Sequence, residues 1–353
     1  MARGRAGGAA RPTIRSVAER AGVSKSLVSL VLQGSPRVGE ESRRAVLAAV
    51  EELGYRPDPA ARSLAERRTR TVGVVLDDLR NPWFVDLLDG LRPVLTAAGL
   101  RPVLADTNAE PRAAGDLVRL RVDGLVVVGT RDDVTAVEEA AAAVPTVLAG
   151  TRDALGAPAD LVADDGEAGV RLVVEHLAAL GHRHLAHVAG TGAVGALRRD
   201  AFERAAGAGG LTATVAAADM TEDGGHRAAL RLLRRPQRPT AVLAANDVSA
   251  LGVLAAADEL GLRVPQDVSV AGYDDTSLAA LRRVSLTSVD NRSREVGRRA
   301  GELLLQRMAD PATAPRTELL LPRLVPRRST GAPAASPPGP PDHRGARPQR
   351  PQP

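Results

Sequence analysis

The 353-residue sequence contains no cysteine, which excludes a disulfide framework and any metal site built on thiolates. Lys25 is the only lysine among 47 basic residues, and only five side chains are aromatic. No apolar run approaches the length of a membrane span. The first dozen residues lack the apolar stretch of a secretory signal. We therefore expect a cytoplasmic protein with no membrane partner.

Acidic residues are scarce at the amino-terminal end. Residues 1–70 hold 14 basic and 7 acidic side chains, whereas the whole chain has a formal net charge of +5. The length exceeds one ordinary domain and favours a small module joined to a larger α/β part. Residues 1–12 and the Pro/Arg-rich tail 331–353 lack apolar periodicity, so we expect both to be disordered. The basic excess near the start is typical of a module that binds phosphate backbones.

Residues 13–34 predict two short helices joined by a tight turn. The first helix runs to Ala21, Gly22 supplies the turn, and Ser24 caps the second helix. Small and basic residues open the second helix, as in a helix-turn-helix whose second helix enters the major groove. The alternative is an ordinary helical hairpin. A third helix is expected over residues 43–53, ended by Gly54.

Four motifs give the chain a close resemblance to the lactose-repressor (LacI/GalR) family. They are Thr13-Ile14 with Val17-Ala18, then Ala21-Gly22-Val23-Ser24, then Gly54-Tyr55-Arg56-Pro57, and finally Ala61-Arg62-Ser63-Leu64-Ala65. The resemblance covers about residues 13–330. It implies a helix-turn-helix domain over 13–58, a hinge helix and linker over 59–70, and a two-lobed effector-binding and dimerisation domain over 71–330. The implied DNA-binding residues are Thr13, Ser24, Lys25, Ser26, Ser29, Leu30, Tyr55, Ala61 and Leu64.

Three positions of the helix-turn-helix domain and hinge depart from the family pattern or allow another role: Leu30, Asp58 and Leu64. Leu30 stands where the family usually has arginine, and leucine makes only apolar contacts, such as one with a thymine methyl group. Asp58 replaces the usual asparagine, yet Asp58-Pro59 is a good start for a hinge helix reaching about Arg67. Leu64 resembles the family's minor-groove wedge. Its alternative role is packing against the same residue of a dimer mate.

From Thr71 onward, short apolar runs alternate with helical patterns. Strands are predicted over 72–76, 102–105, 124–128, 146–148, 185–188, 241–244 and 268–271, and helices include 84–98 and 166–180. This alternation predicts parallel sheets covered on both faces, with ligands bound beyond the carboxyl ends of the strands. The family resemblance implies two lobes of the periplasmic-binding-protein type around a sugar-sized ligand.

Polar and aromatic side chains follow several of these strands. We expect Trp83 to face the cleft, whereas Phe84 fits the cleft and the core equally well. After the last two strands, we expect Asp247 or Asp275 to cap a helix while Asn246 and Asp274 face the ligand. The resemblance implies an effector site made of Asn81, Trp83, Phe84, Arg152, Arg198, Asn246, Asp274 and Asn291.

The same site departs from the family in ways that bear on its ligand. Thr151 replaces an aspartate that often precedes the arginine after the fourth strand, and Asn291 replaces the usual glutamine. Gly192 and Val194 stand where the purine-binding branch uses polar contacts, which argues against a purine. A carbohydrate is therefore the expected effector class, although the common sugars need not fit.

No pattern supports catalysis or a metal site. Asp164-Asp165 suits helix capping at a lobe crossover better than acid–base chemistry. His182, His184 and His187 lack a carboxylate to complete a metal site. Catalytic triads, phosphate loops and dinucleotide fingerprints are absent from the sequence. We expect no enzyme, no cofactor and no metal.

The function expected from the sequence is a DNA-binding transcriptional regulator. We expect a homodimeric repressor that binds a palindromic double-stranded operator near carbohydrate-metabolism genes and responds to a sugar or sugar derivative. The alternative is a sugar-binding receptor of the same fold without a role at DNA.

Overall fold

The computed structural model describes residues 12–32, 34–56, 68–107, 110, 112–129, 134–151 and 158–334. The chain separates into two compact units that divide between Thr69 and Arg70. Among the described residues, no helix is both long enough and apolar enough to cross a membrane.

The first unit contains three helices, α1 (Ile14–Ala21), α2 (Lys25–Leu32) and α3 (Glu40–Leu53). One apolar cluster joins them, centred on the fully buried side chains of Val17, Val28 and Val46. The third helix begins three residues earlier than the sequence predicts. Gly54 ends it in the left-handed region with a φ of 60°, as predicted.

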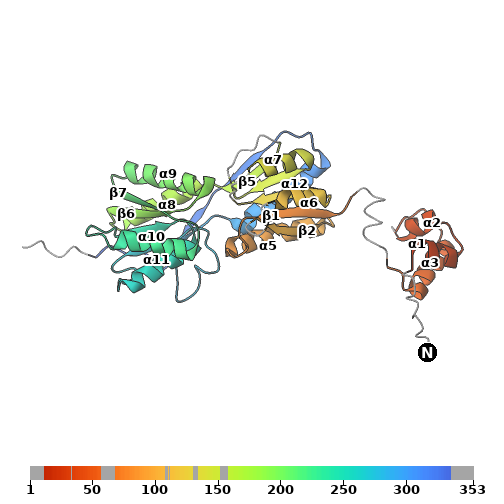
Figure 1. The fold of residues 1–353 in the computed structure, drawn as a ribbon, viewed down its shortest axis with the longest axis horizontal. Coiled ribbons are helices and arrows are strands. Elements are labelled where there is room, and N and C mark those ends of the chain that lie inside the picture. Colours follow the sequence, from red (N-terminus) through yellow and green to blue (C-terminus); the bar gives the residue numbers. More distant parts are fainter. Residues whose placement is uncertain are drawn as a thin grey trace, which may run out of the picture. The chain divides into compact units, whose positions relative to one another are not determined.

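The second unit begins with the lobe that carries the labels β1, β2 and β5 in Figure 1. This lobe is built on a six-stranded parallel sheet in the order β11-β5-β4-β3-β1-β2. Its strands are β1 (Thr71–Leu76), β2 (Arg101–Asp106), β3 (Gly124–Val128), β4 (Thr146–Ala149), β5 (Asp160–Asp164) and β11 (Thr317–Leu320). Helices α5 (Pro82–Ala97) and α12 (Ser293–Ala309) pack on one face, and α6 (Ala113–Arg119) and α7 (Val134–Ala143) on the other. We call this part the N-lobe.

Helices α5 and α12 approach each other closely because glycine occupies their contact. A Cβ atom at Gly90 would lie 1.8 Å from the Arg294 carbonyl oxygen, and one at Gly297 would lie 1.9 Å from the Leu87 carbonyl oxygen. Any larger side chain at either position would force the helices apart. The helix after β10 is therefore fixed on the N-lobe, although the strands that precede it in sequence belong to the other lobe.

The C-lobe holds a four-stranded parallel sheet in the order β7-β6-β8-β9. Its strands are β6 (His184–Ala189), β7 (Thr212–Ala217), β8 (Ala241–Ala244) and β9 (Ser269–Ala271). Helices α8 (Gly166–Ala179) and α9 (Gly192–Ala208) cover one face, and α10 (Glu222–Leu233) and α11 (Asp247–Glu259) cover the other. Strands β10 (Ser288–Asp290) and β12 (Arg323–Val325) form a separate antiparallel pair.

The chain passes between the two lobes three times. It crosses after β5, after β10 and between β11 and β12. The carboxyl ends of the central strands of both sheets face the region of these crossings, where ligands of doubly wound folds bind. The predicted two-lobed α/β architecture is confirmed.

The seven predicted strands are all present, but β5, β7, β10, β11 and β12 were not predicted. The assignment of residue 331 to a disordered tail is wrong. Gly331 donates its backbone N–H to the Ser269 hydroxyl at 3.0 Å and accepts from it at 3.1 Å, which fixes this residue against the C-lobe. Residues 1–11 and 335–353 lie outside the described residues.

Candidate functional site

The first unit has helix-turn-helix geometry at its α1–α2 turn. Gly22 adopts a φ of 69° at the end of α1. The Ser24 hydroxyl then accepts the Leu27 backbone N–H at 3.2 Å, which caps α2. Lys25 and Ser26 are exposed in the first turn of α2. The predicted turn and cap are confirmed, and they leave the start of the second helix open to solvent.

Other predicted DNA-binding residues hold the framework of this unit. Thr13 caps α1 through a reciprocal pair of hydrogen bonds with Ser16, at 2.8 Å and 3.3 Å. Tyr55 packs against the apolar cluster, and Ser29 is half-buried. Ala61 and Leu64, with the whole predicted hinge helix 59–67, lie outside the described residues.

A cavity of about 300 Å³ lies between the lobes. It is lined from the carboxyl ends of β1, β3, β4, β6 and β7 and by α5 and α9, which is where a ligand of this fold is expected. Its lining comprises Asp77, Asp78, Arg80, Asn81, Trp83, Phe84, Gly129, Gly150, Thr191, Gly192, Val194, Arg198, Met220, Thr221 and Asp274.

A buried arginine and a buried carboxylate meet at this cavity. Arg198 of α9 is 6 % exposed and Asp274 is 7 % exposed, and their Nη2 and Oδ1 atoms lie 3.6 Å apart. Arg198 also donates from Nη1 to the Ala245 carbonyl at 2.6 Å. Burial raises the pKa of the Asp274 carboxyl well above its usual range, against the opposing attraction of Arg198. Both were predicted effector residues, and the structure brings them together.

Asn291 connects Asp274 to the aromatic wall of the cavity. Its Nδ2 donates to Asp274 Oδ1 at 2.9 Å, and its Oδ1 accepts the Trp83 indole N–H at 3.1 Å. Asn291 is 2 % exposed and lies behind the cavity lining. The predicted residue is therefore part of the site as a hydrogen-bonded link between the lobes.

Trp83 is at once a core residue and a wall of the cavity. It is 7 % exposed, packs in the N-lobe cluster, and meets Phe84 edge to face with ring centroids 5.0 Å apart. Its ring also covers Gly150, where a Cβ atom would lie only 2.2 Å from Trp83 Cη2. Trp83 and Phe84 both pack in the core and also line the cavity, so the two alternatives apply to each ring at once.

Tyr273 lies under Arg198 and reaches the opposite lobe. The Arg198 Cζ atom sits 3.6 Å from the centroid of the Tyr273 ring, which is a cation–π contact. The Tyr273 hydroxyl donates to Asp164 Oδ2 at 2.5 Å, at the end of β5. A Cβ atom at Gly169 would lie 2.2 Å from this hydroxyl, so α8 passes close to it. Sequence analysis did not assign Tyr273 to the site.

The predicted division between capping and ligand-facing residues after β8 is wrong. Asn246 has extended backbone and caps α11 by accepting the Ser249 N–H at 2.8 Å. Asp247 is already helical, and its carboxylate accepts from Thr276 at 2.7 Å. Asp275 pairs with Arg327 at 2.6 Å.

Asn246 does not line the cavity and contacts a residue that does. Its Nδ2 donates to the backbone carbonyl of Met220, which does line the cavity.

The predicted capping role of Asp165 is confirmed. Asp165 caps α8 by accepting the Ala168 N–H at 3.3 Å. Arg152 and its surroundings at 152–157 lie outside the described residues.

Several lining residues were missed by the sequence analysis. Asp78 and Arg80 form an ion pair at 2.9 Å at the edge of the cavity, and Met220 and Thr221 follow β7. Arg80 helps hold the pKa of Asp78 below its usual value, against the opposing effect of burial. All of these follow the carboxyl ends of strands. Applying that rule to the predicted strand over 72–76 would have identified Asp78 and Arg80, but β7 was not predicted, so the rule could not reach Met220 and Thr221.

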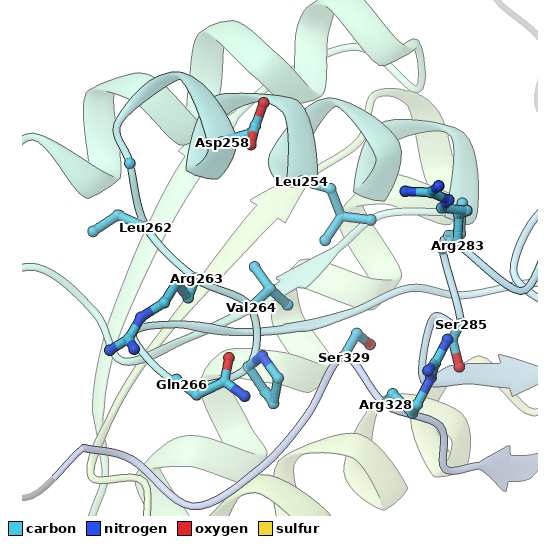
Figure 2. A pocket seen from close by; sticks show the side chains of 13 residues that line it. Leu254, Asp258, Leu262, Arg263, Val264, Gln266, Arg283, Ser285, Arg328 and Ser329 are labelled. Carbon is cyan, nitrogen blue, oxygen red and sulfur yellow. The ribbon is translucent and has the colours of Figure 1, made fainter.

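A second, larger hollow of about 900 Å³ lies in the C-lobe beyond the end of α11 (Figure 2). Arg263, Arg283 and Arg328 border it, with Leu254 and Asp258 on the helix above them. None of the predicted effector residues lines it. The arginines there are exposed, whereas the smaller cavity brings buried charges and aromatic rings to one point. We therefore take the smaller cavity as the candidate effector site.

The histidines have structural hydrogen-bond partners. His182 bonds to Thr240 at 2.9 Å and to the Gly331 carbonyl at 2.9 Å. His187 donates from Nδ1 to the Leu243 carbonyl at 3.0 Å, which leaves Nε2 as a buried acceptor without a partner. Within the described residues, no group of three His, Cys, Asp or Glu side chains could hold a metal ion.

Two family models match this chain. The model for bacterial regulatory proteins of the lacI family matches residues 13–58, and the model for a periplasmic binding protein-like domain matches residues 174–330. The first match covers the helix-turn-helix unit. The second covers most of the C-lobe and the return into the N-lobe.

Named relatives match almost the whole chain. The HTH-type transcriptional repressor PurR of Erwinia tasmaniensis is 34 % identical over 328 residues, covering 90 % of this chain and 96 % of that protein. Among solved structures, this chain is similar to the lac repressor dimer bound to operator and the anti-inducer ONPF. The sequence identity is 32 % and the TM-score is 0.81, and the match covers 91 % of this chain and 99 % of that chain. The transcriptional regulator CelR–cellobiose complex is 33 % identical, with a TM-score of 0.67, and covers 90 % and 100 %.

Proposed function

This chain belongs to the LacI family of bacterial regulatory proteins and is a DNA-binding transcriptional repressor, and we propose that a small neutral carbohydrate in the interlobe cavity controls its operator affinity. The observation that supports this most is the meeting of Arg198 and Asp274 beside Trp83. A sugar hydroxyl can donate to the carboxylate and accept from the guanidinium. The indole ring offers an apolar surface to the C–H face of a pyranose.

The charges that line the cavity favour a neutral ligand. Asp78 is paired with Arg80, and Arg198 lies beside Asp274. Each arginine of the lining therefore already has a carboxylate beside it, and an anionic ligand would have to compete with that carboxylate for the guanidinium. Neutral hydroxyls impose no such cost, and this argument separates free sugars from sugar phosphates.

Two further observations support a carbohydrate over a purine. Gly192 and Val194 line the cavity without polar side-chain atoms, so their side chains form no hydrogen bond with the edge of a base. Among the relatives, one is solved as a complex with cellobiose. Others carry the name PurR, so a purine base remains the ligand to test against the sugar.

The proposed mechanism is linkage between the cavity and the operator. The ligand contacts residues of both lobes, so it favours one arrangement of the lobes over another. The ratio of the ligand's affinities for operator-free and operator-bound protein is the factor by which saturating ligand changes operator affinity. We further propose a homodimer on a palindromic operator, as in the solved lac repressor dimer, and sedimentation of the protein–operator complex measures this.

Because the operator is bacterial DNA, we propose that the protein acts in the cytoplasm. We propose carbohydrate-metabolism genes as its targets. We propose no catalytic activity, because the relatives are named as repressors and regulators. The alternative of a sugar receptor without a role at DNA is set aside, because the helix-turn-helix unit matches the lacI-family model.

The test combines a ligand screen with one substitution. Neutral sugars, sugar phosphates and purine bases are added to the purified protein, and the shift in melting temperature is measured. A neutral sugar should stabilise the protein, and Asp274→Ala should abolish this shift. Each lost hydrogen bond is worth about 0.5–3 kcal/mol, with the upper part of this range for a charged acceptor, or roughly two- to a hundred-fold in affinity.

The matched control is Asp200→Ala, an exposed aspartate on α9 two residues from Arg198. Both variants should keep wild-type operator affinity, since the DNA-contacting unit is separate. If only a purine stabilises the protein, the proposed carbohydrate effector is wrong and the effector is a purine base. An Asp274→Ala protein that still responds to the sugar at the wild-type concentration would remove Asp274 from the site.

A further inference from the structure

Helix α2 exposes a leucine on the surface that also carries its polar residues. Leu30 is 38 % exposed, whereas Val28 and Val31, which pack in the apolar cluster of the unit, are 0 % and 5 % exposed. Ser26 is exposed one turn before Leu30, and Lys25 precedes it. Residues four apart lie on one face of a helix, so Ser26 and Leu30 project together. The outward face of α2 is therefore short, lightly charged and partly apolar.

The side chains on this face differ in what they can recognise in a major groove. Lysine can donate to the O6 and N7 acceptors of guanine, and serine can bond to either kind of group. No residue of α2 is an arginine, the side chain that most often recognises guanine by two hydrogen bonds. Leu30 can form no hydrogen bond. The only apolar group that an unmodified base pair presents in the major groove is the C5-methyl of thymine.

We propose that Leu30 recognises the C5-methyl group of thymine, so that each operator half-site carries a thymine at the base facing this side chain. The proposal rests on the operator-binding function and names one base that the operator must contain. Exposure alone does not carry it, since Leu47 of α3 is 50 % exposed in the same unit. The argument depends on the place of Leu30, one turn after the residues that open the second helix of a helix-turn-helix.

The test starts from a duplex chosen by the full-length protein itself. Binding sites are selected from a randomised palindromic library, and each thymine of the enriched half-site is replaced in turn by deoxyuridine, which removes only the methyl group. At one symmetric position, affinity should fall about four-fold per half-site, the equivalent of about 0.8 kcal/mol for one buried methyl group. Cytosine paired with guanine there should bind weakly, and 5-methylcytosine should recover part of the loss.

Two alanine variants decide whether Leu30 is responsible. Leu30→Ala should bind the thymine and deoxyuridine duplexes equally, and Leu47→Ala should keep the four-fold difference. Both positions are exposed, so each variant should fold, and circular dichroism verifies this. In a second selection, Leu30→Arg should replace the thymine by guanine at the same position.

The outcomes separate this proposal from the function on which it rests. An enriched palindrome in which no deoxyuridine lowers affinity by more than two-fold keeps operator binding and overturns the role of Leu30. A four-fold difference that survives in Leu30→Ala also overturns it. If no site is enriched at all, operator binding itself fails and the proposal fails with it. The effector screen is unaffected by any of these results.

Discussion

Gly150 tests the geometry of the cavity, because its lack of a side chain lets the Trp83 ring lie against the backbone. Gly150 follows β4 with a φ of 70°, and an added Cβ atom would lie 2.2 Å from Trp83 Cη2 and 2.7 Å from Cζ2. Ordinary Cβ contacts are more than 1 Å longer than the first of these distances. In Gly150→Ala the indole must therefore move away, and its 3.1 Å hydrogen bond to Asn291 should break.

The expected loss of stability has two parts. Alanine in the left-handed region costs about 1–2 kcal/mol. Breaking the indole–amide bond leaves a buried acceptor on Asn291 unpaired, which costs about 1–3 kcal/mol more. Gly150→Ala should then lower the free energy of unfolding by about 2–5 kcal/mol. Gly99 has the same backbone conformation, with a φ of 71°, and an added Cβ atom there would meet no other atom within 4 Å, so Gly99→Ala isolates the first part.

The assay uses the protein's own fluorescence. Trp83 is the only tryptophan of the chain, so its emission reports on the cavity without labelling. Chemical unfolding gives the free energies, and the emission maximum of Gly150→Ala should shift to longer wavelength as the ring loses its buried partner. Gly99→Ala should keep the wild-type maximum. Equal losses of stability in the two variants, with unchanged emission in both, would refute the packing of Trp83 on Gly150.

Two further substitutions separate structural from ligand-binding roles. Tyr273→Phe keeps the ring beneath Arg198 but loses the hydroxyl bond to Asp164, so the free energy of unfolding should fall by about 1.5–3 kcal/mol. Sugar binding, measured by calorimetry, should persist in this variant. Its complete loss would contradict a purely structural role of the Tyr273 hydroxyl. Burial lowers the pKa of His187 to about 4, so stability should rise by about 3 kcal/mol as pH increases from 4 to 6.5. His187→Leu should flatten this rise in pH-dependent unfolding, whereas the partly exposed His226→Gln should retain it.

The sequence predicted strands well where both faces are buried. All five residues of β3 and all four of β4 are buried, and apart from Thr146 at the start of β4 they form apolar runs. Strand β7 lies at the edge of its sheet, where three of its residues are exposed and three are half-buried, and its two threonines interrupt the apolar pattern. Strand β11, at the edge of the other sheet, alternates exposed and half-buried residues. Pairing with a distant segment creates these edge strands, and a local pattern does not contain that information.

The sequence predicted which side chains meet at the cavity better than it predicted the hydrogen bonds that each of them forms. Arg198 and Asp274 were expected to converge, and they do. The helix cap after β8 was assigned to the wrong residue because neighbouring Asn and Asp both favour caps. The backbone decides between them: Asn246 is still extended at the helix start, whereas Asp247 is already helical. Asp247 then finds its donors on Thr276 and Ser288, about thirty and forty residues away in sequence, which no local motif could indicate.

Under the proposed effector control, strand β1 is the segment of chain that joins the cavity to the DNA-binding unit. The cavity lies at the carboxyl end of β1, and the chain enters β1 at Thr71 from the helix-turn-helix unit. At that entry, the Arg70 N–H donates to Asp123 at 2.9 Å and its carbonyl accepts from Arg101 at 2.9 Å, so the start of the strand is fixed to the sheet. Six strand residues, about 20 Å, therefore separate the cavity from the linker. Because a packed sheet moves as one body, any ligand that shifts the N-lobe also shifts the anchor of the DNA-binding unit.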